Sequence, residues 1–405
     1  MTEQAKVPAI RFAGFTDPWE QRKLSEVATF GGGHTPPMAD PDNYEDGYVL
    51  WVTSQDVKSN YLDRTTTQIT EKGAKELTLY PAGSLVMVTR SGILRHTLPV
   101  AELRKPSTVN QDIRVILPQG ECCGEWLLQF FISHNKELLL EFGKTGTTVE
   151  SVDFGKIKDM LLYMPSTVEQ QQIGDFFAKL DSLITLHQRK YDKLVILKKS
   201  MLEKMFPKDG ESVPEIRFAG FTDPWEQRKA SEVFQIVDDR GHPTLPVLSA
   251  TQNQGMIYRD DSGRYIGHDE SNEIGYKRVL PGDFVVHLRS FQGGFAHSQY
   301  EGITSPAYTV FRAKEPTSHS DRFWKHWFMS EHFIAGLSTV TYGIRDGRSI
   351  SVDEFMNTFL AFPAVEEQAA ISRLFDYLDD LITLHQRKLE LLQNIKKSLL
   401  DKMFV

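Results

Sequence analysis

The feature that most constrains the fold of this chain is a long internal duplication. The segment PAIRFAGFTDPWEQRK (8–23) returns as PEIRFAGFTDPWEQRK (214–229), with 15 of 16 residues identical. Two further pairs lie 198 residues apart: LDSLITLHQRK (180–190) with LDDLITLHQRK (378–388), and KKSMLEKMF (198–206) with KKSLLDKMF (396–404). A period near 200 residues is too long for a solenoid, so the chain is predicted to hold two modules of similar plan in tandem.

Composition bounds the class of protein. A chain of 405 residues has room for two or three domains, and 40% apolar with 25% charged residues is typical of globular proteins. The sequence has no apolar run of about 18 residues that would predict a membrane span. Its first ten residues lack the apolar stretch of a signal peptide. Cys122 and Cys123 are adjacent, a spacing that predicts neither a disulfide framework nor a metal site. We therefore expect a cytoplasmic location and no membrane partner.

The charge balance bears on nucleic-acid binding. The net charge is −8, and it is negative in both middle regions, −5 for residues 24–165 (13 basic, 18 acidic) and −4 for residues 230–362 (12 basic, 16 acidic). Nonspecific affinity for nucleic acid comes largely from Lys and Arg facing phosphates. If the chain binds DNA, we expect partner proteins to supply part of the phosphate contact.

Between the repeated ends, the two halves differ in sequence but share a pattern. Short runs rich in Val, Ile, Thr and aromatic residues, bounded by turn residues, predict strands. They lie within YVLWVTSQDV, GSLVMVTRSG and DIRVILP in the first half and FVVHLRS and AYTVFRA in the second. Helical segments are predicted at 125–142 and 321–337. The predicted fold class is α+β, with two tandem domains built on mixed β-sheets.

The repeated opening and a nearby glycine run also carry local signals. Asp17 as N-cap, Pro18 at the first helical position and Glu20 at N3 predict a helix start, with the same pattern in the second copy. The FGGGHTP stretch (30–36) predicts a flexible loop, because it lacks the context of a phosphate-binding motif.

Each half ends in a long predicted helix with apolar residues at alternating intervals of three and four, which is a heptad seam. Each helix spans about 38 residues, or ~57 Å at ~1.5 Å per residue. A helix of this length with an apolar seam needs a partner, and its own repeat is the obvious one. His187 and His385 fall in the seam, where they are expected to fix register. We expect pairing through Ile173, Phe177, Leu180, Ile184 and Leu194 in the first helix and Ile371, Phe375, Leu378, Ile382 and Leu392 in the second.

These patterns predict four segments. Residues 1–165 form the first mixed domain and 166–206 the central repeat helix. Residues 207–362 form a polar linker followed by the second mixed domain, and 363–405 form the C-terminal repeat helix.

At this point a family resemblance becomes specific. The chain resembles the specificity subunits of type I restriction-modification enzymes, over its whole length. The resemblance rests on the paired PWEQRK openings, the paired LHQRK helices and the stretches MPSTVEQQQI (164–173) and FPAVEEQAAI (362–371). The family signature of Pro, Glu, Gln and Ile falls at Pro165, Glu169, Gln170 and Ile173, and again at Pro363, Glu367, Gln368 and Ile371.

The resemblance implies an architecture and a set of partners. Each middle domain would be a target recognition domain that reads one half of a bipartite sequence in double-stranded DNA. The two helices would pair as an antiparallel coiled coil that sets the spacer and docks two methyltransferase subunits. Two motor-nuclease restriction subunits would complete an ATP-dependent enzyme. S-adenosylmethionine and ATP with magnesium are then expected on the partners, with no cofactor and no metal in this chain.

Motifs for catalysis are missing from the sequence. EFGKTGTT (141–148) contains Gly-Lys-Thr, but Leu138 stands where a P-loop requires its first glycine. The sequence holds no HExxH, no GxSxG and no paired CxxC. We therefore expect a non-catalytic subunit with no catalytic residues.

DNA contacts are expected from loops at one end of each sheet, where Arg, Lys, Gln, Ser and Thr favour base readout. Arg90-Ser91 and Arg289-Ser290 each follow an apolar strand, which suggests one scaffold with different loops. The candidates are Arg90, Ser91, Arg95, Lys144, Thr145, Thr147 and Thr148 in the first domain and Arg289, Ser290, Gln292, Arg345 and Arg348 in the second.

Two other readings stay open on the residues alone. A stand-alone two-headed DNA-binding regulator would share the tandem plan, but the acidic balance argues against tight binding without partners. The second alternative is a scaffold protein that does not read DNA, or an acidic inhibitor that mimics DNA. Interspersed rather than clustered acidic residues weigh against a mimic.

Overall fold

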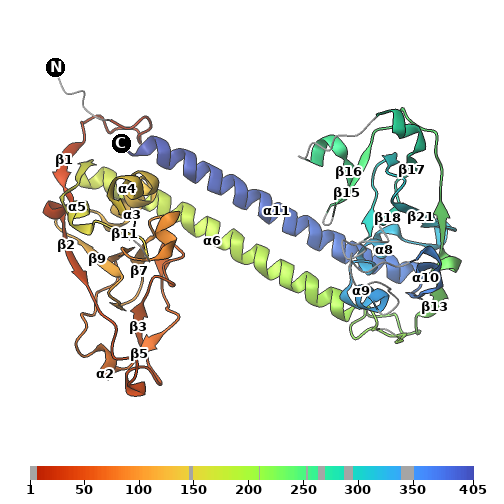
Figure 1. The fold of residues 1–405 in the computed structure, drawn as a ribbon, viewed down its shortest axis with the longest axis horizontal. Helices are drawn as coiled ribbons and strands as arrows, with labels where there is room; N and C mark the ends of the chain where they lie inside the picture. The colour runs from red at the N-terminus through yellow and green to blue at the C-terminus, as the bar shows by residue number, and fades with distance from the viewer. Residues whose placement is uncertain are drawn as a thin grey trace. The chain divides into compact units, whose positions relative to one another are not determined.

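The computed structural model describes residues 7–145, 149–208, 210–251, 254–262, 270–286, 295–338 and 351–405. The chain divides into two compact units. Unit 1 comprises residues 1–188 and 387–405, and unit 2 comprises residues 189–386. Each unit therefore holds one mixed domain and a part of both long helices, which Figure 1 labels α6 and α11.

The two long helices form as predicted and pack together. Helix α6 spans Thr167–Lys204 and α11 spans Val365–Met403. In unit 1, Lys396 Nζ donates to Asp181 Oδ1 at 2.6 Å. In unit 2, Lys198 Nζ donates to Asp379 Oδ1 at 2.5 Å. The two contacts are repeat equivalents, because the two aspartates are 198 residues apart in sequence and so are the two lysines. In each unit a late residue of one helix meets an early residue of the other, so the pairing is antiparallel.

Unit 1 is built on a five-stranded sheet with the order β2-β9-β6-β7-β4. All neighbours are antiparallel except β4 and β7, and a second sheet, β5-β3-β8, contains another parallel pair. The bounds are β2 Ala28–Gly32, β3 Val49–Val52, β4 Tyr61–Leu62, β5 Gln68–Ile69, β6 Leu85–Val88, β7 Val100–Leu103, β8 Thr108–Val109 and β9 Ile113–Pro118. Its short helices are α1 Leu24–Val27, α2 Glu71–Ala74, α3 Gly124–Ser133, α4 Asn135–Phe142 and α5 Phe154–Asp159. The sheets are mixed, as predicted.

Unit 2 repeats the central sheet. Its strand order is β14-β21-β18-β19, all antiparallel, which matches β2-β9-β6-β7 of unit 1 strand for strand. The bounds are β14 Phe234–Val237, β15 Leu248–Thr251, β16 Gly255–Tyr258, β17 Lys277–Val279, β18 Phe284–Val286, β19 Ala296–His297, β20 Gly302–Thr304 and β21 Thr309–Ala313. Its helices are α7 Ala230–Val233, α8 Asp321–Trp327, α9 Glu331–Ser338 and α10 Val352–Asn357. The two middle regions therefore share one scaffold despite their different sequences.

The repeated opening is a strand, so the helix predicted from Asp17, Pro18 and Glu20 is wrong. β1 (Glu20–Lys23) pairs antiparallel with β12 (Leu161–Met164). β13 (Glu226–Lys229) pairs in the same way with β22 (Phe359–Phe362). Each pair joins the start of a module to the strand just before its long helix. Hydrogen bonds to that distant strand outweigh the local helix signal, since propensity is only a weak prior.

The glycine run is also ordered differently from the prediction. Gly31 and Gly32 belong to β2, and the Tyr80 hydroxyl accepts from Gly32 N at 2.8 Å and donates to Gly32 O at 2.7 Å. A Cβ at Gly31 would overlap the Tyr80 ring. The glycines therefore permit close approach of a side chain to the strand rather than loop flexibility.

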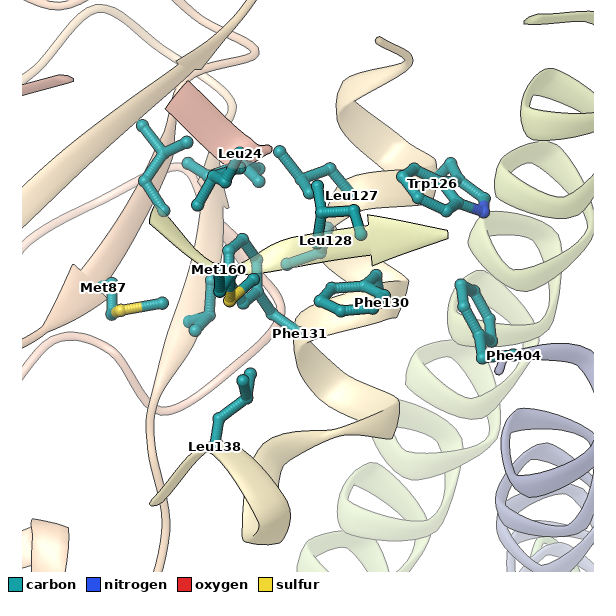
Figure 2. Packing of buried hydrophobic residues seen from close by; sticks show 14 of the residues in the cluster. Leu24, Met87, Trp126, Leu127, Leu128, Phe130, Phe131, Leu138, Met160 and Phe404 are labelled. Carbon is teal, nitrogen blue, oxygen red and sulfur yellow. The ribbon is translucent and has the colours of Figure 1, made fainter. Parts of the chain in front are cut away.

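A hydrophobic core joins each mixed domain to the helix pair, and Figure 2 shows part of the core of unit 1. In unit 1 the Phe404 ring lies 6.1 Å from the rings of both Trp126 on α3 and Phe177 on α6. In unit 2 the repeat-equivalent Phe206 stacks on Phe375 of α11 at 5.7 Å. These two repeat-equivalent phenylalanines, just beyond the ends of α6 and α11, thus pack on equivalent residues of the opposite helix.

The predicted seam residues fall in these cores. Ile173, Phe177 and Leu180 are buried in the unit 1 core, and Ile371, Phe375 and Leu378 are buried in the unit 2 core. The remaining four are half-buried: Ile184 and Leu392 pack against the unit 1 core, Leu194 packs against the unit 2 core, and Ile382 lies on α11.

The paired Glu-Gln signature tethers each module opening to its long helix. The guanidinium of Arg11 donates to both carboxylate oxygens of Glu169, at 2.8 and 2.6 Å, and Arg217 does the same to Glu367 at 2.8 and 2.7 Å. Both glutamates are about 1% exposed. A two-point arginine–carboxylate pair of this kind fixes orientation as well as distance.

The adjacent glutamine makes a second tether. Gln170 accepts from Cys123 N at the start of α3 and donates to Pro165 O, both at 2.9 Å. Gln368 accepts from Ser320 N at the start of α8 and donates to Pro363 O, again both at 2.9 Å. Each glutamine thus holds a domain helix onto a long helix, which places the sheet and its loops.

Candidate nucleic-acid interface

The candidate interface in unit 1 forms where the chain leaves β6. β11 (Ser151–Val152) runs beside this exit: Val152 N donates to Thr89 O at 3.0 Å, and Ser91 N donates to Glu150 O at 3.1 Å. Arg90 forms an isolated bridge with Ser151. The loop after β6 is therefore held by main-chain bonds on both sides of Arg90, and the exposed Arg90 side chain projects from a fixed backbone.

A short 3-10 helix, η2 (Gly92–Arg95), follows directly. Ser91 is its N-cap and accepts from Ile93 N at 3.5 Å. Arg95, at its end, places Nε 2.5 Å from Glu150 Oε1. The turn thus brings Arg95 back to Glu150, the residue that already binds the main chain of Ser91.

The hairpin strand β10 (Gly143–Lys144) completes the cluster by pairing with β11. Lys144 Nζ lies 2.9 Å from Asp153 Oδ2, and Asp153 Oδ1 also caps α5 by accepting from Lys156 N at 3.2 Å. Thr145 follows on the exposed side of the hairpin. Five of the seven candidates in the first domain are therefore brought to one surface: Arg90, Ser91, Arg95, Lys144 and Thr145.

Electrostatics set what this surface can do. The hydrogen bond from Arg95 holds the pKa of Glu150 below its usual value, and the bond from Lys144 lowers the pKa of Asp153. Both carboxylates are therefore ionised at neutral pH. Arg95 and Lys144 each pair with one of these anions, so their positive charge is partly offset. Such a cluster suits directional hydrogen bonding more than bulk attraction to phosphates.

The other candidates cannot be placed. Those that lie outside the described residues are Thr147, Thr148, Arg289, Ser290, Gln292, Arg345 and Arg348. In unit 2 the described strand β18 (Phe284–Val286) ends just before Arg289 and Ser290, as β6 ends before Arg90 and Ser91. The correspondence of strands noted in the sequence is thus matched by sheet position.

Sequence reasoning missed the two acidic members of the cluster. Glu150 and Asp153 were not singled out, because carboxylates are poor candidates for contact with DNA. Glu150 meets Arg95 across 55 residues of sequence, and only the pairing of β11 with the exit of β6 brings them together. No local pattern in the sequence signals such a pair.

Two searches of the described residues bear on other functions. No helix among them is long and apolar enough to cross a bilayer. No group of three or more His, Cys, Asp or Glu side chains in the same part of the chain could hold a metal ion.

Comparison with known proteins agrees with this architecture. Residues 16–195 match the family model described as the type I restriction modification DNA specificity domain. The EcoR124I/EcoR124II specificity subunit of Escherichia coli is 29% identical over 186 residues, which are 43% of this chain and 46% of that one. The matched part thus spans less than half the length of that relative.

Two longer matches cover nearly the whole chain. The MjaVIII specificity subunit of Methanocaldococcus jannaschii is 22% identical over 408 residues, covering 95% of this chain and 91% of that one. The crystal structure of a type I restriction-modification S subunit from M. genitalium has a TM-score of 0.59 at 10% identity, with 99% of both chains covered. This last likeness shows the fold.

Two mixed domains on a shared scaffold and a pair of long helices are the fold that this chain shares with the M. genitalium S subunit. The chain is similar to type I restriction-modification specificity subunits: residues 16–195 match their DNA specificity domain, and nearly the whole chain aligns with the MjaVIII subunit.

Proposed function

We propose that this chain gives a type I restriction-modification complex its DNA sequence specificity. The target recognition domain of each unit reads one half of a bipartite site in double-stranded DNA. Unit 1 reads with the loops that follow β6 and join β10 to β11, and unit 2 reads with the corresponding loops after β18. The chain itself is non-catalytic in this proposal.

One observation carries the proposal. Four strands of the central sheet recur in the same order in both units, whereas the loops at its ends differ in sequence. A duplicated scaffold with different loops suits the reading of two different half-sites, as a pseudo-symmetric protein can do in one chain what a dimer does at a palindrome.

Exposed apolar residues on the long helices support docking of two identical methyltransferase subunits. Among them are Leu183, Leu186 and Leu197 on α6 and Leu384, Leu391 and Ile395 on α11. Each lies one residue before a seam position, so on each helix the three share one flank of the seam. Leu186 and Leu384 are repeat equivalents, as are Leu197 and Ile395. Equivalent apolar surfaces suit two copies of one partner.

The helices also suit a role in spacing the two half-sites. Each has 38 or 39 residues without interruption, or about 57 Å at ~1.5 Å per residue. In this proposal the antiparallel pair sets the length of the spacer. The methyltransferase subunits carry S-adenosylmethionine, and two motor-nuclease subunits carry ATP and magnesium.

The test is to co-express the chain with the methyltransferase subunit encoded beside it and to map methylated adenines across the host genome. We expect a split motif with a gap of fixed length. An assembled, soluble complex that leaves no such motif would contradict the proposal and favour an inhibitory relative. A chain that binds DNA tightly alone, without assembling with the methyltransferase, would favour the stand-alone regulator.

A further inference from the structure

Arg95 is held at one nitrogen only. Its Nε lies 2.5 Å from Glu150 Oε1, and its terminal nitrogens have no hydrogen bond or ion pair within the part of the chain that the structure describes. The Arg95 side chain is 63% exposed. A guanidinium fixed at Nε directs its two terminal nitrogens away from the anchoring carboxylate, where they form a flat two-donor fork.

Glu150 is a rigid anchor for that fork. Its side chain is only 14% exposed, its main-chain oxygen accepts from Ser91 N at 3.1 Å, and it directly precedes β11. Its Oε2 is shielded from water and has no hydrogen-bond partner among the described residues. The carboxylate charge therefore acts chiefly on Arg95. One residue thus fixes both the start of η2, through Ser91, and the arginine at its end.

We propose that Arg95 reads a guanine in the half-site recognised by unit 1, and that Glu150 is the positioning residue that orients it. This inference rests on the proposed function, since it names the base class that one residue of that interface recognises. The terminal nitrogens of Arg95 would donate to O6 and N7 of the guanine in the major groove. This two-point contact is the commonest specific pairing of arginine with DNA.

Guanine fits this geometry better than phosphate does. A phosphate contact needs charge but little orientation, and Lys144, tied to Asp153, or the exposed Arg90 would serve it as well. The Arg95 charge is partly offset by Glu150, which weakens attraction to phosphate. The same carboxylate limits the rotation of the guanidinium, which favours a contact that depends on direction.

The experiment uses the assembled methyltransferase complex and duplexes that carry its mapped motif, with each base pair of the unit 1 half-site replaced in turn. Relative methylation rates are compared for the unmodified complex and for Arg95→Ala, Arg95→Lys and Glu150→Gln. Arg22→Gln is the matched control, because it removes one exposed positive charge from β1 of the same unit.

We expect Arg95→Ala to abolish the preference for guanine at one position of one half-site. Discrimination there should fall by about 5- to 150-fold, the range for one good two-point base contact, with the other half-site and the spacer unchanged. Arg95→Lys should lose most of the same preference. Glu150→Gln should relax the same position by a smaller factor without lowering the thermal stability of the complex. Arg22→Gln should change no position.

Three outcomes would overturn the inference while leaving the proposed function intact. One is a uniform rate loss across all duplexes, which would make Arg95 a phosphate contact. Another is altered preference at an A·T position, and the third is an unchanged motif in every variant. If the unmodified complex yields no bipartite motif at all, the proposed function itself fails.

Discussion

Lengthening both long helices by one heptad should lengthen the spacer of the recognised DNA. The change duplicates ITLHQRK at 184–190 in α6 and the identical ITLHQRK at 382–388 in α11. Seven added residues preserve the alternation of three and four in each seam, and equal insertions in both helices preserve the ion pairs of Asp181 with Lys396 and of Lys198 with Asp379.

The magnitude follows from helix geometry. Seven residues add ~10 Å at ~1.5 Å per residue, which corresponds to about three base pairs at ~3.4 Å each. Three base pairs also rotate the second half-site by roughly 100°, given about 10.5 base pairs per turn. Supercoiling of the helix pair has to absorb that rotation, so we expect a spacer longer by one to three base pairs together with reduced activity.

The assay is the genome-wide map of methylated adenines in cells that express the lengthened chain with its methyltransferase subunit. The control inserts the heptad in α6 alone, which should prevent assembly, because the ion pairs and the seam no longer match. An active complex with both insertions and an unchanged spacer would refute the idea that the helices measure the spacer.

Three other outcomes are expected. Replacing residues 230–362 with the equivalent domain of another specificity subunit should change one half-site only. A methylome map in which both half-sites are altered would contradict the proposal that each domain reads one half-site. Phe404→Ala should destabilise unit 1 by about 3–5 kcal/mol in denaturant titration, as for other buried Phe→Ala changes, and a loss below about 1 kcal/mol would show that its contacts with Trp126 and Phe177 matter little. Burial raises the pKa of Glu102 to about 7 despite the nearby Arg104, so unit 1 should lose stability as pH rises from about 4.5 to 7. Glu102→Gln should remove on the order of 1 kcal/mol of that loss. A variant whose thermal unfolding has the same pH profile as the unmodified chain would contradict this prediction.

The sequence predicts best where one periodic signal runs through many residues. The seam of each long helix extends over nearly five heptads, so its period is unambiguous, and α6 and α11 match the predicted length. The apolar runs that form β6 and β9 are equally clear, because β-branched and other aliphatic residues stand between turn residues.

The failures share a physical cause, which is contact over long sequence distance. β1 was read as a helix because its partner β12 lies about 140 residues away and leaves no trace in the local pattern. Gly31 was assigned to a flexible loop because the Tyr80 ring that packs on it is 49 residues away. The pair of Arg95 and Glu150 is of the same kind. In each case a tertiary contact determines the role of the residue, whereas its neighbours in sequence suggest a different role.

These contacts explain which residues are identical in the two modules and which differ. Arg11, Glu169 and Gln170 are repeated as Arg217, Glu367 and Gln368 because each set fastens a module opening and a domain helix to a long helix. Among the described residues, the loop after β6 has no such hydrogen bond to a long helix, so it can differ without loss of the scaffold. A chain that keeps its fastening residues twice and varies its loops can therefore change what each domain reads while its helix pair, and the surface offered to partners, stay the same.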